Sequence, residues 1–395
     1  MNNNQNRYYA DYFLIVILVF LAVISIFTLY TIQPALPPDI SNTKFYVRQA
    51  LWFIIGGVFI GMMMILDYDW YRKLSWYLYG IGVLLLLGLA LNIPASLVLT
   101  LNHSTSWYSI PHVGTIQPGE FMKVFLIITL GHVITSHHEK RKTPQVRDDL
   151  WLLIKILIIA LPPVGLVVIQ PDLGTALVYL SITAVLILIS GIRWRILFAV
   201  AGIILVVTGA ALGLFYLFPG IIKQLEDSIF SHALERFYGW LAPEQHADSY
   251  GMQLIQAMLS IGSGQLFGKG MMNLEVYIPE RHTDMIFTAI AEQFGFIGGS
   301  VVVMVFFLLI YRIIHISLAC KDPFGSYLGA GTAGMITYQI VQNIGMSIQL
   351  LPITGLPLPF ISYGGSSLIA YFMAMGLVMN VRSRHKVFMF DTKNE

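Results

Sequence analysis

The sequence predicts an all-α integral membrane protein of about ten transmembrane helices, and two observations predict this class. First, 56% of the 395 residues are hydrophobic and only 11% are charged, whereas a soluble globular protein carries about 25% charged residues. Second, the hydrophobic residues gather in runs of roughly 20, which is the length a helix needs to cross the hydrocarbon core of a bilayer. An ordinary soluble protein is therefore excluded.

The hydrophobic runs follow one another along the whole chain, so we predict a single polytopic membrane domain over residues 1–395. The fourth run is short and begins with polar residues. The predicted spans, in chain order, are 12–32, 48–66, 74–93, 121–136, 151–169, 172–190, 194–218, 284–311, 326–350 and 361–381.

Lysine and arginine predict the orientation, because cytoplasmic loops of membrane proteins carry an excess of both. With the N-terminus inside, fifteen of the 23 Lys and Arg residues fall on the cytoplasmic side. The outer side keeps seven: Lys44, Arg48, Lys123, Lys223, Arg236, Lys269 and Arg281. We therefore expect both termini in the cytoplasm, and a large extracellular loop, 219–283, between the seventh and eighth spans.

Two outer loops, 94–120 and 219–283, are long, and long loops are often functional. In the second, the stretch KQLEDSIFSHALERFYGWL (223–241) has apolar residues at helical spacing. This pattern predicts a helix that either lies in the membrane interface or caps the bundle. The sequence leaves both positions open.

The stretch SIGSGQLFGKGMMN (260–273) follows, with four glycines that allow close approach of the backbone. It lacks the Gly-Lys-Ser/Thr ending of a phosphate-binding P-loop. The spacing alone therefore favours a plain turn over a phosphate cradle.

Ionisable side chains stand at the outer ends of four predicted spans: Arg48, Glu120 with Lys123, Asp172, and Asp284. Such groups are costly inside a membrane and are usually functional. Glu120 and Lys123 are three residues apart, which places them on one helical face where they can pair. All four groups could converge on one outer cavity.

Asp172 and Asp284 could instead have a structural role, because both stand where predicted spans begin. An acidic residue at that position interacts favourably with the helix dipole. Thr283 would be a suitable N-cap ahead of Asp284. The structural role is favoured for Asp172 and stays open for Asp284. Glu280 and His282, beside it, could be solvated loop residues.

Structural roles are equally open for the charges of the second and fourth spans. The Glu120–Lys123 pair could serve only to fix the register of its helix. Arg48 could extend to the outer headgroups of the bilayer. The sequence does not decide between these structural roles and a role in binding.

Five stretches carry the most specific pattern in the chain. They are QPGEFMK at 117–123, IQPDLGTAL at 169–177, SIGSGQLFGKG at 260–270, PERHTDMIF at 279–287 and GLPLPFISYGGSSL at 355–368. Together they resemble the motifs of the SEDS family (shape, elongation, division and sporulation), typified by RodA, FtsW and SpoVE. The resemblance covers nearly the whole chain.

The chain departs from the family pattern at three positions. Gly119 stands where the family's QPSE-x-x-K motif has serine, Gln265 replaces a glycine, and Met285 replaces a phenylalanine. Arg281 in PERHTD and the short termini look more like RodA than FtsW. An FtsW-type division role remains the alternative to a role in cell elongation.

The resemblance implies a multi-pass enzyme of the bacterial cytoplasmic membrane with its active site facing outside. The family's glycosyltransferases polymerise lipid II, the undecaprenyl-diphosphate-linked disaccharide-peptide, into the glycan strands of peptidoglycan. They work with a class B penicillin-binding protein that supplies the transpeptidase. The family's essential aspartate corresponds to Asp284.

This chemistry assigns expected roles to the outer-face residues. A sugar hydroxyl attacks an anomeric carbon as a lipid diphosphate departs, and Asp284 would be the base. One displacement converts an α-linked diphosphate into a β-glycosidic bond, so no covalent intermediate is expected.

Fixed cations would stabilise the departing diphosphate, and the candidates for substrate binding are Arg48, Lys123, Arg236 and Lys269. Glu120 would position Lys123, while Glu280 and His282 would shape the surroundings of Asp284. A divalent cation could share the work, although the sequence has no ligand cluster with metal spacing.

Two different functions also fit a chain with many helices and outer charges. One is a flippase that moves lipid II across the bilayer. The absence of an obvious inverted repeat and the clustering of charges near the outer face favour catalysis instead. The second is a non-catalytic scaffold that recruits a penicillin-binding protein.

Overall fold

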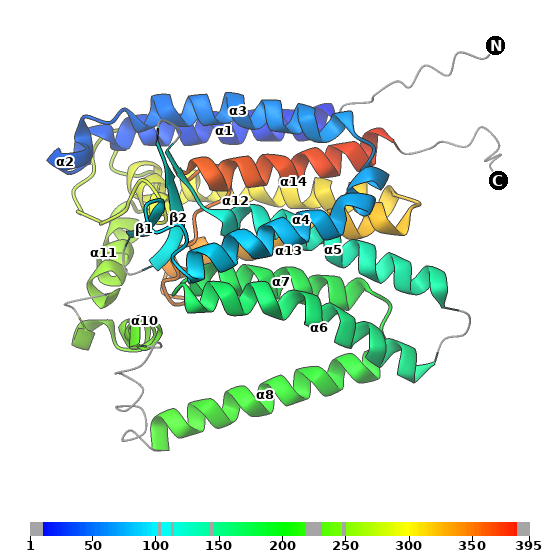
Figure 1. The fold of residues 1–395 in the computed structure, drawn as a ribbon. Helices are drawn as coiled ribbons and strands as arrows, with labels where there is room; N and C mark the ends of the chain where they lie inside the picture. Colours follow the sequence, from blue (N-terminus) through cyan, green and yellow to red (C-terminus); the bar gives the residue numbers. More distant parts are fainter. Residues whose placement is uncertain are drawn as a thin grey trace, which may run out of the picture.

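The computed structural model describes residues 11–101, 104–111, 114–141, 145–217, 231–246 and 250–384, and helices dominate it (Figure 1). The helices of the first half are α1 (Tyr12–Ile32), α2 (Pro38–Ser41), α3 (Phe45–Ile65), α4 (Tyr68–Ala90), α5 (Pro118–Lys140), α6 (Val146–Ile169), α7 (Leu173–Ile189) and α8 (Trp194–Leu217). Those of the second half are α10 (Ser231–Leu241), α11 (Tyr250–Ser263), α12 (Ile286–Ala319), α13 (Pro323–Ser347) and α14 (Gly365–Ser383), with short 3-10 turns at Gln33–Ala35 and Pro243–His246.

Each of the ten predicted spans overlaps one of these helices, and the first coincides with α1. Among the described residues, six helices are long and apolar enough to cross a membrane on their own: α1, α3, α4, α5, α6 and α12. The fourth predicted span, 121–136, is too short, because the polar start of the motif QPGE already belongs to α5, where Pro118 stands in the first turn. That all ten cross the membrane stays a prediction.

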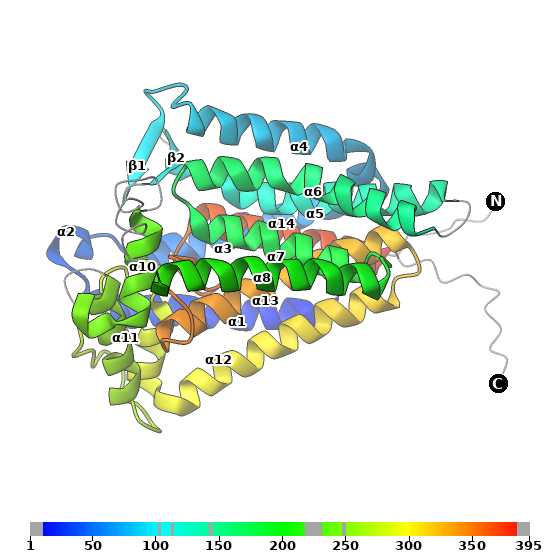
Figure 2. The same cartoon turned by 90° about the horizontal axis from the view of Figure 1, so that it is seen from below.

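The long helices lie roughly side by side, while α10, α11 and a small sheet gather at one end of the bundle (Figures 1 and 2). The start of α1 and the end of α14 lie at the other end (Figure 1). Helix α5 is the most enclosed of the candidate spans, with 78% of its most apolar window buried. Which end of the bundle faces the cytoplasm stays a prediction.

The all-α prediction is wrong in one respect, because the 94–120 loop forms an antiparallel three-stranded sheet. Its strands, β1 (Val98–Leu101), β2 (Ser104–Ile110) and β3 (Gly114–Ile116), pair in the order β1-β2-β3. Tyr108 pairs with Val98 on one side and with Ile116 on the other. The strands are rich in β-branched and aromatic residues, which favour a pleated surface, but they are too short to stand out among the apolar helices.

The segment 219–283, predicted to be an outer loop, contains more regular structure than the one predicted helix. Of that helix, 223–241, the part up to residue 230 lies outside the described residues, and the rest forms α10. The α10 side chains contact the segment between α13 and α14: Trp240 Nε1 donates to the Gln349 carbonyl at 3.0 Å, and Arg236 donates to that of Thr354 at 3.3 Å. This geometry supports the position in which the helix caps the bundle. Helix α11 was not predicted.

Helix α12 is broken at Gly295, whose φ of 63° and ψ of −159° are not helical. The break removes two backbone hydrogen bonds of the helix, and bonds to the glycine-rich turn (264–273) replace both. The amides of Phe296 and Ile297 donate to the Gln265 and Leu266 carbonyls at 2.8 and 3.2 Å. In return, the carbonyls of Glu292 and Gln293, which a continuous helix would bond internally, accept from the amides of Lys269 and Gly270 at 2.9 and 3.1 Å.

Glycine is needed where this turn meets the helix. A Cβ at Gly268, which has a φ of +81°, would lie 2.1 Å from the Gln293 carbonyl oxygen. At Gly264 it would lie 2.0 Å from that of Ala291. The favoured turn is therefore found at residues 264–273, while residues 260–263 belong to the end of α11.

Candidate active site

Asp284 lies in a tight turn, residues 280–285, just before α12. Glu280 opens the turn with a φ of +51°, and its carbonyl accepts from the amides of Thr283 and Met285 at 3.1 and 3.4 Å. Helix α12 begins at Ile286, and the N-cap position belongs to Met285, which makes no side-chain cap. The hypothesis that Thr283 and Asp284 start the helix is therefore wrong, because the turn delays the helix beyond them.

The turn is held against the loop that carries the motif GLPLPFISYGG. The Asn343 side chain on α13 donates to the carbonyls of Asp284 and Leu356, at 2.6 and 2.8 Å. The Tyr363 amide donates to the His282 carbonyl at 3.0 Å. Two of the five motifs of the sequence, PERHTDMIF and GLPLPFISYGGSSL, thus meet at Asp284.

The surroundings of Asp284 make its carboxyl group easy to protonate near neutral pH. Burial, followed by repulsion from Glu280, raises the pKa of Asp284 to about 7. The Thr283 hydroxyl, which donates to Oδ1 at 3.3 Å, and the charge of Arg236 oppose this rise. A carboxylate whose pKa lies near the working pH is suited to accept a proton in a reaction.

The two neighbours of Asp284 differ in their exposure. Glu280 is exposed, as expected of a solvated loop residue, yet its charge acts on Asp284. His282 is half-buried, and its ring centroid lies 4.5 Å from that of Phe45. Burial lowers the pKa of His282, which favours the neutral ring. His282 is therefore a packed side chain of the site wall.

The Glu120–Lys123 pair forms as predicted, with Lys123 Nζ 2.6 Å from Glu120 Oε1. Both side chains are almost completely buried. Because the amine has no exposed surface, this geometry supports a structural role for the pair, and a diphosphate-binding role for Lys123 stays a prediction.

The remaining predicted charges have other partners or surroundings. Asp172 caps α7 by accepting from the Thr175 amide at 3.0 Å and from the Gln117 side chain at 3.1 Å. Its favoured structural role is confirmed. Arg48 is exposed on α3, which leaves both a headgroup contact and a binding role open. Arg236 is a predicted cation whose charge lowers the pKa of Asp284.

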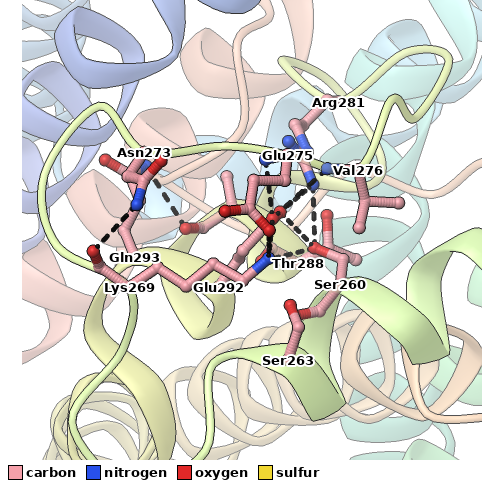
Figure 3. Close-up of polar contacts among 11 residues, drawn as sticks. Ser260, Ser263, Lys269, Asn273, Glu275, Val276, Arg281, Thr288, Glu292 and Gln293 are labelled. Carbon is pink, nitrogen blue, oxygen red and sulfur yellow. Dashed lines mark hydrogen bonds and ion pairs between the residues drawn. The ribbon is translucent and has the colours of Figure 1, made fainter.

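Lys269 forms ion pairs with two carboxylates. Its Nζ lies 2.7 Å from Glu275 and 3.1 Å from Glu292. Glu292 is the functional candidate that the sequence reasoning missed. It is completely buried in α12 and also contacts Arg281 and Ser260 (Figure 3). The sequence signal that could have indicated Glu292 is an acidic residue inside a predicted apolar span.

A cavity of about 450 Å³ lies beside the turn, between the segment 274–282 and the residues that run from the end of α1 into α2. Apolar side chains line it together with Glu275, Glu280, Arg281 and His282. Pockets of this size hold drug-sized molecules. The described residues contain no group of three His, Cys, Asp or Glu side chains that could hold a metal ion, so the part played by a divalent cation stays open.

Comparison with known proteins identifies the family of the chain. A family model described as cell cycle protein, for FtsW, RodA and SpoVE, matches residues 9–387. The chain belongs to this family. The resemblance drawn from the five motifs is thereby confirmed.

The relatives in this family include both FtsW and RodA types. The chain is 32% identical over 377 residues to the "Probable peptidoglycan glycosyltransferase FtsW" of Bacillus subtilis, covering 94% of this chain and 90% of that protein. It is 27% identical over 436 residues to the "Peptidoglycan glycosyltransferase RodA" of Treponema pallidum, covering 95% and 98%.

Among solved structures, the chain resembles one described as "Structural coordination of polymerization and crosslinking by a peptidoglycan synthase complex". The TM-score is 0.74 at 26% identity, and the match covers 94% of this chain and 97% of that chain. The helical membrane fold is therefore shared with a member of a peptidoglycan synthase complex.

Proposed function

We propose that the protein is a peptidoglycan glycosyltransferase that polymerises lipid II into glycan strands at the outer face of the cytoplasmic membrane. Family membership and relatives named as peptidoglycan glycosyltransferases support the enzyme class. The observation that carries the proposal is Asp284, a carboxylate with a pKa of about 7 that caps no helix and lies where two specific motifs meet.

In the proposed reaction, Asp284 removes the proton from an acceptor sugar hydroxyl as that oxygen attacks the anomeric carbon of the donor. The bond from this carbon to the diphosphate oxygen breaks, and undecaprenyl diphosphate leaves with the electron pair. The single displacement inverts the anomeric carbon, so no nucleophilic side chain is required. The half-buried position of Asp284 limits competition from water.

The leaving diphosphate requires positive charge, and Arg236 is the candidate that the geometry favours. Arg236 is partly buried on α10, and its charge is felt at Asp284. Arg48 is exposed and could meet a diphosphate at the membrane surface. Lys123 and Lys269 would first have to separate from their carboxylate partners.

The direct test is polymerisation of lipid II by the purified protein, with and without a co-expressed partner. The wild type should make glycan strands. Asp284→Asn removes the negative charge with little change in volume and should make essentially none, since base catalysis is typically worth about 10²–10⁴-fold in rate. Near wild-type polymerisation by a folded Asp284→Asn protein would refute the role of Asp284 as base, whereas a folded wild-type protein that makes no glycan with or without the partner would favour the scaffold or the flippase.

The proposed location of the site requires the end of the bundle that carries α10 to face outside. Single cysteines at Ser231 and Ser383, in a background without Cys320, can be probed with an impermeant thiol reagent in intact cells. Labelling is expected at position 231 only. Labelling at position 383 alone would invert the orientation.

The proposed partner is a class B penicillin-binding protein. The similar solved structure is described as a complex that coordinates polymerisation and crosslinking, which supports this choice. Co-purification from native membranes in mild detergent tests it, and repeated recovery without such a protein would contradict it. Cell elongation is the proposed role, with division as the alternative, since relatives named FtsW and RodA both match.

A further inference from the structure

Glu292 binds five donors with one buried carboxylate. Its Oε1 accepts from Lys269 Nζ at 3.1 Å and from the backbone amides of Glu275 and Val276 at 2.9 and 3.3 Å. Its Oε2 accepts from the Ser260 hydroxyl at 2.8 Å and from the Arg281 guanidinium at 2.5 Å. The proposed chemistry uses none of these contacts.

The five donors come from three different segments (Figure 3). Ser260 belongs to α11, Lys269 to the glycine-rich turn, and Glu275, Val276 and Arg281 to the segment that leads into the active-site turn. Glu292 therefore fastens the outer loop to α12, within one helical turn of the break at Gly295.

Arg281 connects this cluster to the catalytic carboxylate. It is 95% buried, and it precedes Asp284 by three residues in the same tight turn. The turn is thus fixed by the Arg281–Glu292 ion pair at its beginning, by the Tyr363 amide, which donates to the His282 carbonyl, and by Asn343, which donates to the Asp284 carbonyl, at its end. The bonds within the turn, from Thr283 and Met285 to the Glu280 carbonyl, do not by themselves set its position relative to the rest of the protein.

We propose that Glu292 is a positioning residue that acts through Arg281 to hold Asp284 at the distance and angle required for proton transfer. The inference rests on the proposed function, because it assigns Asp284 the role of base. Its physical basis is that a misplacement of about 1 Å can cost roughly 10²-fold in rate. Glu292 itself touches neither Asp284 nor a reacting group.

The decisive variant is the double substitution Arg281→Gln with Glu292→Gln. Removing one partner alone would leave a buried charge unpaired and could prevent folding. The double variant removes both charges, and two amides can still form one hydrogen bond. The matched control is Glu275→Gln, which removes a carboxylate from the exposed end of the same cluster, where the ion pair with Lys269 contributes little.

Two measurements are made on each purified protein. In lipid II polymerisation, the double variant should lose at least about 30-fold in kcat with KM within about threefold, as expected for a misplaced base. In hydrogen–deuterium exchange, the peptide covering 280–285 should exchange at least about tenfold faster. Glu275→Gln should resemble the wild type in both measurements.

The outcomes separate this inference from the proposed function. Unchanged exchange at 280–285, or wild-type kcat in a double variant whose turn has loosened, would overturn the positioning role while Asp284→Asn remains inactive. A double variant that fails to fold would also overturn it, since the cluster would then hold the fold as a whole. Wild-type protein that makes no glycan would instead refute the proposed function, and an active Asp284→Asn protein would refute the role of Asp284 as its base.

Discussion

The pKa of Asp284 predicts how the polymerisation rate depends on pH. The base is active when deprotonated, so the rate must fall as the pH drops through the pKa of the carboxyl. That pKa is raised from 3.8 to about 7, chiefly by burial and then by the Glu280 charge. An ordinary aspartate would remain deprotonated from pH 5 to 8, and the rate would not change for this reason.

The magnitude follows from the titration of one group. At pH 7 about half of the protein is active, at pH 6 about one-tenth, and at pH 5 about one-hundredth. Glu280→Gln removes the repulsion that helps to raise the pKa of Asp284, so the acid limb of the pH–rate profile should move to lower pH. The limb should stay above the ordinary aspartate value, because burial is the larger cause.

The assay is the initial rate of lipid II polymerisation at subsaturating substrate, since kcat/KM reports the free enzyme. Buffers should span pH 5 to 8.5 at constant ionic strength. His282→Gln serves as the control, because burial places the His282 pKa below its usual value. Whatever its maximum rate, this variant should keep the limb near pH 7. A wild-type profile that stays flat down to pH 5 would refute the reasoning.

Two further predictions concern stability. Glu120→Ala and Lys123→Ala should each lower the free energy of unfolding by about 3–5 kcal/mol, because each leaves a buried unpaired charge. Thermal melts in detergent should show that the double variant is destabilised by less than the sum of the two single variants. Strict additivity would show that the two side chains do not interact. Gly268→Ala should destabilise by at least about 1–3 kcal/mol, because its left-handed backbone is strained with a side chain and its Cβ would meet the Gln293 carbonyl. Gly262→Ala, where nothing lies within 4 Å, should not lower the melting temperature.

The sequence predicted the helices well because long apolar runs carry a strong local signal. The first predicted span coincides with α1, and the following nine overlap their helices. The sheet at 98–116 was missed, since three short strands carry a weak signal. The start of α12 was placed two residues early, because the turn closed by the Glu280 carbonyl depends on contacts with α13 and with the loop before α14 rather than on local composition.

The candidate site was predicted in part for the same reason. Asp284 and its neighbours stand together in one motif, so their proximity follows from the sequence. The Glu292 cluster does not, because its donors come from residues 260–281 and meet only where α12 breaks at Gly295. The pairing of Lys269 with two carboxylates also required the folded loop.

The break in α12 also decides which part of the molecule carries the base. Two backbone hydrogen bonds of the helix are replaced by bonds to the glycine-rich turn, so the segment 286–294 is joined to that turn across the break. Asp284 is therefore held by the segment 260–281, by α13 and by the loop before α14, and not by the part of α12 beyond Gly295. A displacement of the segment 260–281 reaches the carboxylate within a few residues, whereas a tilt of the part of α12 beyond Gly295 first meets the break in the helix.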